Sequence, residues 1–98
     1  MEIQFEWDEK KAQINLKKHG VSFDEAATIF GDTMSITIDD PIHSTSEPRW
    51  ITIGRSAQGK LLVVAHAERG DDIRLISARK ATRKERHVYE EESGQGRP

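Results

Sequence analysis

Three stretches rich in apolar and β-branched residues follow one another in the second half of the chain and are separated only by short turns; the first and third alternate polar and apolar side chains. They cover residues 50–55, 60–67 and 73–79. Alternation with this composition is typical of strands that bury one face. A parallel connection needs a dozen or more residues, whereas these turns contain only a few. The sequence therefore predicts an antiparallel meander over residues 50–79.

The N-terminal quarter carries the signals of a short strand followed by a helix. Residues 2–7 alternate polar and apolar side chains and predict the strand. Asp8 is a good N-cap, and Gly20 suits the left-handed position just past a helix end. We therefore expect a helix from Asp8 to His19, with Leu16 on its apolar face.

The remaining elements are a second helix, a strand, a loop, a final helix and a disordered tail. They are expected at residues 22–30, 34–39, 40–48, 82–92 and 93–98, in that order. The second helix is marked by Ser22 and Glu25, which have the spacing of a capping box. The element order lacks the regular strand–helix alternation of a parallel sheet. It predicts an α+β fold, in which helices pack on a twisted antiparallel sheet within one domain at residues 3–92.

Length and composition narrow the class of protein. A chain of 98 residues, of which 33% are charged, can form one small domain but not a large multidomain enzyme. The absence of cysteine excludes disulfides, thiolate metal sites and a cysteine nucleophile. There is no apolar run of about 20 residues and no signal-peptide pattern, so we expect a cytoplasmic protein that does not enter a membrane.

Charge is unevenly distributed along the chain. Residues 1–50 contain five Lys/Arg and ten Asp/Glu, whereas residues 51–98 contain ten and seven. The basic excess gathers in one segment, which contains Arg69, Arg74, Arg79, Lys80, Arg83, Lys84 and Arg86. Such a patch can contact phosphates, but on charge alone a solvated helix face with i,i+4 ion pairs is the more ordinary interpretation.

The histidines do not form a spaced metal-binding motif. His66 and Glu68 could supply two ligands from one strand face, with His43 or His87 as a third. Four histidines in 98 residues is an unremarkable number, and no phosphate-binding loop occurs either. We therefore expect neither a metal nor a cofactor.

Two arginines at the ends of predicted strands are a stronger candidate for a functional site than the histidines. An arginine pair such as Arg69 and Arg79 can clamp a phosphate and stays charged at every working pH. Strict alternation puts Arg79 on the same strand face as Leu75 and Arg74 on the other face. Whether Arg69 and Arg79 share a face depends on the register between their strands, which the sequence leaves open.

RNA cleavage would suit such a site because RNA supplies its own nucleophile, the ribose 2′-OH. The protein must then accept one proton, donate another and neutralise the phosphate. His19, with Lys18 beside it, is one candidate for proton transfer, and Glu68 is another. Each of these residues alone is better explained as a helix-capping group or an ion-pair partner.

Several sequence blocks, in consistent order and spacing, resemble the BrnT family of bacterial toxins. They are F-E-W-D-E-K-K-A at 5–12, N-L-K-K-H-G-V-S-F-D-E-A-A at 15–27, E-R-G at 68–70 and I-R-L-I-S-A-R-K-A-T-R-K-E-R at 73–86. The resemblance implies a RelE-like fold with two N-terminal helices and one C-terminal helix. It also implies a metal-independent ribonuclease that inhibits translation and is neutralised by a BrnA-type antitoxin with a ribbon-helix-helix DNA-binding domain.

The resemblance carries over only the polar residues at matching positions, Lys18, His19, Arg69, Arg74, Arg79 and Lys80. The predicted site adds to them the candidates chosen from the residues themselves. In the catalytic group we place Lys18, His19, Glu68, Arg69 and Arg79. In RNA binding we place Arg74, Lys80, Arg83 and Lys84. The alternative hypothesis is a noncatalytic module whose basic patch docks nucleic acid or an acidic protein partner.

Overall fold

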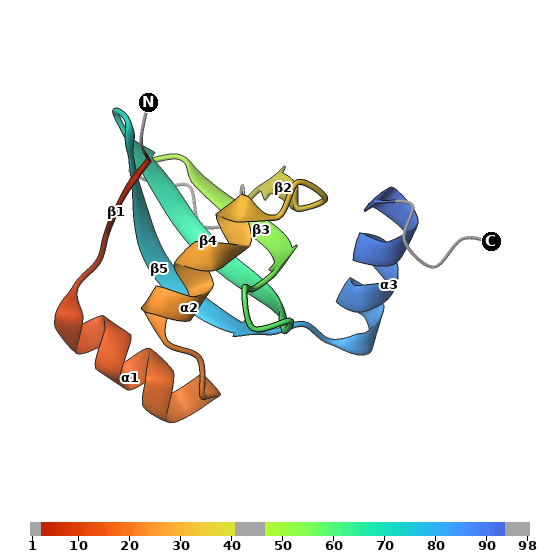
Figure 1. Cartoon of the computed structure of the whole chain (residues 1–98). Helices are drawn as coiled ribbons and strands as arrows, with labels where there is room; N and C mark the ends of the chain where they lie inside the picture. Colours follow the sequence, from red (N-terminus) through yellow and green to blue (C-terminus); the bar gives the residue numbers. More distant parts are fainter. Residues whose placement is uncertain (1–2, 41–46, 94–98) are drawn as a thin grey trace.

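The computed structural model describes residues 3–40 and 47–93, which form a five-stranded sheet with helices on both faces (Figure 1). The strands are β1 (Gln4–Glu6), β2 (Ile36–Asp39), β3 (Arg49–Arg55), β4 (Leu61–Arg69) and β5 (Asp72–Lys80). The helices are α1 (Glu9–His19), α2 (Phe23–Ala27), the 3-10 turn η1 (Thr28–Gly31) and α3 (Arg83–Ser93). The strands lie in the order β1-β5-β4-β3-β2.

The expected meander is confirmed, but the sheet is mixed rather than antiparallel. β3, β4 and β5 pair antiparallel in sequence, and β2 pairs antiparallel with β3. β1 instead pairs parallel with β5. Most of the chain lies between these two strands, so the long connection that a parallel pair needs is present. The prediction of a wholly antiparallel sheet is therefore wrong at its β1 edge.

A bulge in β5 changes which side chains share a face. Ala65 pairs with Ser77 and His66 pairs with Leu75, so Ile76 has no partner in the β4–β5 register. One extra residue shifts the alternation of the side chains that follow it. Leu75 consequently faces the α1–α2 side of the sheet, whereas Arg79 faces the opposite side. The expectation from strict alternation, which put these two residues on one face, is wrong for this reason.

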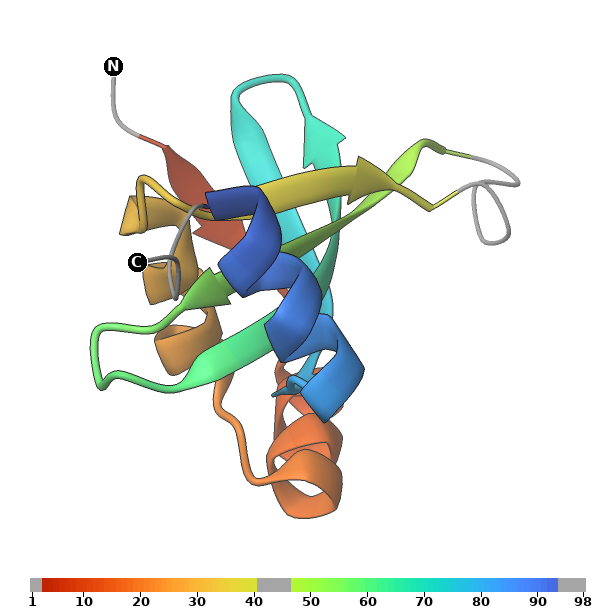
Figure 2. The ribbon, with the colours of Figure 1, turned by 90° about the vertical axis from the view of Figure 1, so that its right-hand side faces the viewer.

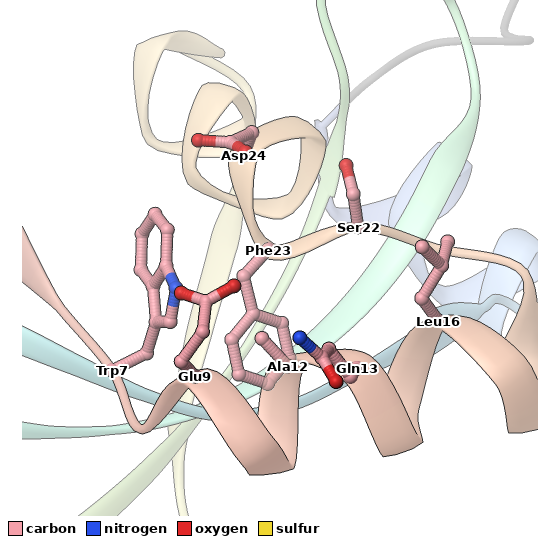
Figure 3. A pocket seen from close by; sticks show the side chains of 8 residues that line it. All are labelled: Trp7, Glu9, Ala12, Gln13, Leu16, Ser22, Phe23 and Asp24. Carbon is pink, nitrogen blue, oxygen red and sulfur yellow. The ribbon is translucent and has the colours of Figure 1, made fainter.

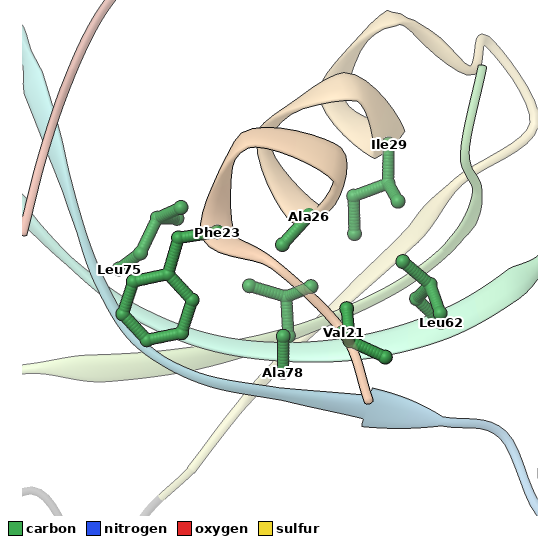
Figure 4. Close-up of a cluster of buried hydrophobic side chains, with 8 residues drawn as sticks. Val21, Phe23, Ala26, Ile29, Leu62, Leu75 and Ala78 are labelled. Carbon is green, nitrogen blue, oxygen red and sulfur yellow. The ribbon is translucent and has the colours of Figure 1, made fainter. Parts of the chain in front are cut away.

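The larger hydrophobic core lies between the sheet and the helices α1 and α2 (Figure 4). Its buried members are Val21, Phe23, Ala26, Ile29, Leu62, Val64, Leu75 and Ala78. Leu16 was expected on the buried face of α1, but it is 50% exposed. The buried residue of α1 is Asn15, whose carboxamide hydrogen-bonds to the backbone of β5.

The helix boundaries follow the predicted caps. Asp8 accepts hydrogen bonds from Lys10 and Lys11, and Gly20 has a φ of 72° past the end of α1. The second predicted helix, residues 22–30, is divided into α2 and η1. Ser22 caps α2 as expected, accepting from the Glu25 N–H.

The Glu25 carboxylate does not complete the predicted capping box. It is buried and accepts a hydrogen bond from the Ser56 hydroxyl at 2.8 Å, and Lys60 Nζ lies 4.0 Å from it. Glu25 therefore ties α2 to the β3–β4 turn. Such a contact between residues distant in sequence cannot be recognised from local spacing.

Helix α3 covers one end of the other sheet face (Figure 2). Tyr89 is fully buried beside Ile53, Leu61 and Val63, and its hydroxyl donates to Asp32 at 2.7 Å. Partial burial raises the pKa of Asp32, but hydrogen bonds from the Arg55 N–H, the Tyr89 hydroxyl and the Met34 N–H lower it below its ordinary value. These contacts anchor α3 by its buried tyrosine.

Helix α3 continues to Ser93, one residue into the segment expected to be a tail. The rest of that segment, 94–98, and most of the predicted loop, 41–46, lie outside the described residues. None of the helices in the described part of the chain is long and apolar enough to cross a membrane.

Candidate functional site

A hollow on the face of the sheet opposite α1 and α2 gathers polar residues from β3 and β5. Arg49 begins β3, Asp40 follows β2, and Ser77 and Arg79 lie in the second half of β5. The floor is apolar and consists of Ile51, Val63, Ala65 and Ile76. Cations around an apolar floor suit an anion with a flat organic portion attached, which is the chemistry of a nucleotide.

A second hollow adjoins the first at β5, and we call the two connected because they share lining residues. It is lined by Lys11, Ile14, Asn15, Lys18, His19, Ile76 and Ser77. The two hollows share Ile76 and Ser77. The volumes are about 240 and 200 Å³. Pockets for drug-sized ligands usually enclose about 300–1,000 Å³. Two small, connected hollows suit a polymer chain that crosses the surface better than an enclosed small molecule.

The β5 bulge brings a third arginine to the same face as the first hollow. Arg49 pairs with Ala67, and Ala67 pairs with Arg74, so the two arginines flank β4 in one cross-strand row. Their backbones are about 10 Å apart, twice the spacing of neighbouring strands. Without the bulge, alternation would place Arg74 and Arg79 on opposite faces. With it, Arg49, Arg74 and Arg79 lie on the sheet face opposite α1 and α2, which we call the open face.

The Arg79 guanidinium is fixed by a bidentate ion pair with Glu85 of α3. The distances are 2.7 Å from Nη1 to Oε1 and 2.8 Å from Nη2 to Oε2. The hydrogen bonds that Arg79 donates lower the pKa of Glu85 to about 2, and the same bonds raise the pKa of Arg79. The pair is therefore fully charged throughout the working pH range.

The structure does not bring Arg69 and Arg79 together. Arg79 pairs with Val63, six residues before Arg69 on β4, which corresponds to about 20 Å along the strand. Arg69 lies instead 3.6 Å from a Glu47 carboxylate oxygen. A clamp in which both arginines hold one phosphate is therefore wrong. Glu68 lies at the same distant end, is exposed and lines neither hollow.

Of the predicted site residues, Lys18, His19 and Arg79 line the connected hollows. Lys80 ends β5, and Arg83 and Lys84 lie in the first turn of α3. All three residues are exposed. They flank the site without lining it.

Four residues of the site were missed from the sequence: Asp40, Arg49, Ser77 and Glu85. The spacing of Thr82 and Glu85 is that of a capping box, and this signal could have drawn attention to Glu85. Nothing local marks the other three, because the sheet register brings them together.

No group of three potential metal ligands exists among residues 3–40 and 47–93. His66, considered above as a possible ligand, is buried between Phe30 and Thr52, whose hydroxyl lies 2.7 Å from His66 Nε2. Burial lowers the pKa of His66 to about 4, so the ring is neutral near pH 7. His43, considered above as a possible third ligand, lies outside the described residues.

A further groove, between α1 and α2, has different chemistry (Figure 3). Trp7, Leu16 and Phe23 give it apolar walls, while Glu9 and Asp24 are its charged residues. Its lining contains no lysine or arginine. Two carboxylates without a cation repel a phosphate backbone, so this groove is poorly suited to bind a nucleic acid.

Comparison with known proteins identifies the family to which this chain belongs. The family model described as "Ribonuclease toxin, BrnT, of type II toxin-antitoxin system" matches residues 7–85. The fold is similar to the crystal structure of the Brucella abortus ribonuclease toxin BrnT, with a TM-score of 0.66 and 22% sequence identity. The alignment covers 84% of this chain and 100% of that one. The sequence has no significant match among curated proteins. The chain belongs to the BrnT family of ribonuclease toxins of type II toxin–antitoxin systems.

Proposed function

We propose that the two connected hollows are the RNA-cleavage site of a metal-independent endoribonuclease with a RelE-like arrangement. The observation that carries the proposal is the β5 bulge, which aligns Arg49, Arg74 and Arg79 on one open face. Guanidinium groups neutralise the charge that develops on a phosphate in the transition state and need no metal to do so. The scissile phosphate would lie at Arg79, with the flanking chain along the other arginines.

In this proposal the ribose 2′-OH attacks the adjacent phosphorus and the 5′-oxygen leaves, giving a 2′,3′-cyclic phosphate and a 5′-hydroxyl end. His19 and Lys18 reach this region from α1 across Ser77, which belongs to both hollows. Asp40 supplies a carboxylate within the first hollow. These groups are the candidates for removing the 2′-OH proton and for protonating the leaving oxygen.

The test is cleavage of a synthetic RNA by the purified chain in excess EDTA. We expect cleavage, and we expect a matched RNA with a single 2′-deoxyribose at the cleavage position to stay intact. Loss of cleavage in EDTA with recovery on adding a divalent cation would contradict a metal-independent mechanism. Equal cleavage of the 2′-deoxy RNA would contradict attack by the 2′-OH.

We further propose that the chain acts on RNA in the bacterial cytoplasm, where its activity inhibits translation. A BrnA-type antitoxin with a ribbon-helix-helix domain would neutralise it by covering the open face and the start of α3 with an acidic segment. Charge complementarity would speed their encounter and fix the docking face. Expression of the chain alone should then arrest growth, and coexpression with the antitoxin should restore it. If the purified complex cleaves RNA as fast as the free toxin, the shared surface is wrong.

A further inference from the structure

We propose that Glu85 is a positioning residue for RNA cleavage, which fixes the Arg79 guanidinium so that its free edge faces the scissile phosphate. This inference rests on the proposed function and adds a role for a residue outside both hollows. The carboxylate of Glu85 approaches the Arg79 terminus from α3, whereas Arg79 itself lines the first hollow from β5. One side of the guanidinium is thus occupied by protein and another side borders the hollow.

Counting the Arg79 donors identifies the edge that is left for a ligand. A guanidinium has five N–H groups. Nη1 donates to Glu85 Oε1 at 2.7 Å and to the Lys80 carbonyl at 3.3 Å, and Nη2 donates to Glu85 Oε2 at 2.8 Å. The Nε–H and the second Nη2–H remain without a protein partner in the described part of the chain. These two donors are parallel and match two oxygens of one phosphate.

Glu85 is itself held firmly enough to orient another side chain. Its Oε1 accepts a hydrogen bond from the Thr82 N–H at 2.9 Å, and its own N–H donates to Thr82 Oγ1 at 3.1 Å, which forms a complete capping box. Tyr89, one turn later, is buried in the second core and anchors α3 to the sheet. Tyr89 thus holds the helix that carries Glu85, and the capping box with Thr82 holds the Glu85 backbone and carboxylate in place.

The effect of the Glu85 charge on KM and on kcat distinguishes a residue that positions Arg79 from one that contributes to RNA binding. A carboxylate beside a phosphate weakens RNA binding, so removing its charge should leave the KM unchanged or lower it. The same change removes the ion pair that holds the Arg79 guanidinium in place. It should therefore lower kcat, because a displacement of about 1 Å in a catalytic group can cost about a hundredfold in rate. A residue with a purely structural role would not separate the two constants in this direction.

The decisive variant is Glu85→Gln, because glutamine retains the capping bond to the Thr82 N–H while losing the ion pair. We expect kcat to fall about tenfold to a hundredfold, with KM for a short RNA unchanged or lower. Thr82→Ala is the matched control, because it removes only the hydroxyl that caps α3 and leaves both Arg79–Glu85 bonds and the backbone N–H bond to Glu85 Oε1. It should lower the melting temperature while kcat stays within about twofold of the parent.

Arg79→Lys tests the same inference without changing α3. A lysine keeps the positive charge but cannot bind Glu85 and offer a parallel donor pair at once, so its kcat should fall nearly as far as that of Arg79→Ala. Full activity in Arg79→Lys, or a kcat of Glu85→Gln equal to or above that of the parent, would overturn the positioning role. Failure of the parent chain to cleave RNA would instead overturn the proposed function.

Discussion

The side chain of Asn15 makes the two hydrogen bonds to the Ala78 backbone that a neighbouring strand would otherwise make. Its Nδ2 donates to the Ala78 carbonyl at 2.8 Å, and its Oδ1 accepts from the Ala78 N–H at 3.0 Å. β1 pairs only with residues 72–74, so this part of β5 has a free edge on the side of α1. The carboxamide thus satisfies both backbone groups of a buried residue and fixes α1, which carries Lys18 and His19, against β5.

Replacing Asn15 should therefore be costly. Asn15→Ala removes three hydrogen bonds, including one to the Val21 carbonyl, and leaves buried backbone groups unpaired. We expect the free energy of unfolding to fall by about 3 kcal/mol, measured by urea denaturation. Gln13→Ala on the exposed side of α1 is the control and should change it by less than about 0.5 kcal/mol. Equal effects of the two substitutions would contradict a bridging role for Asn15.

The buried His66 should make the fold sensitive to mild acid. Because burial lowers its folded pKa to about 4 from an ordinary value of 6.5, the unfolded chain binds this proton first as pH falls. Stability should be independent of this group above pH 6.5 and decrease between pH 6.5 and 4, by about 3 kcal/mol at most.

The measurement is the free energy of unfolding at several pH values for the parent and for His66→Gln. The variant should lose most of the slope between pH 6.5 and 4 whatever its absolute stability. His87→Gln, at an exposed position on α3, should keep the parent slope. If the parent and His66→Gln have the same slope, proton uptake by His66 is not its cause.

Tyr89→Phe should loosen α3 without leaving a cavity. The substitution removes only the hydroxyl that donates to Asp32 at 2.7 Å, while the Arg55 and Met34 N–H groups still bind that carboxylate. A hydrogen bond to a charged group contributes about 1.5–3 kcal/mol, and the retained partners should limit the loss to about 1–2 kcal/mol. Thermal unfolding followed by circular dichroism measures it. An unchanged melting temperature would show that the hydroxyl does not anchor the helix.

Local signals predicted the elements that depend on local chemistry. Asp8 and Ser22 are recognisable as N-caps because their side chains bind backbone groups a few residues away. Gly20 is recognisable because glycine suits the left-handed position past a helix end. The meander was recognised because short turns permit only antiparallel neighbours. The resemblance to BrnT toxins, carried by whole sequence blocks, identified the family correctly.

Long-range geometry limited the prediction of the site. The bulge at Ile76 cannot be recognised in an alternating sequence, yet it decides which face Arg79 occupies. The parallel pairing of β1 joins segments separated by most of the chain. Asn15 has the polarity of a surface residue, but its carboxamide meets a free strand edge that exists only in the folded sheet.

Comparing Arg79→Ala with Arg69→Ala decides whether RNA is cleaved on the open face. The measurement is the single-turnover rate of RNA cleavage, with circular dichroism to show that both variants are folded. We expect about a hundredfold loss for Arg79→Ala, because one phosphate contact contributes about 3 kcal/mol in the transition state. Arg69, about 20 Å away along the strand, should change the rate by less than about threefold. A folded Arg79→Ala variant with the parent rate, or a larger loss for Arg69→Ala, would show that RNA is not cleaved at Arg79 on the open face.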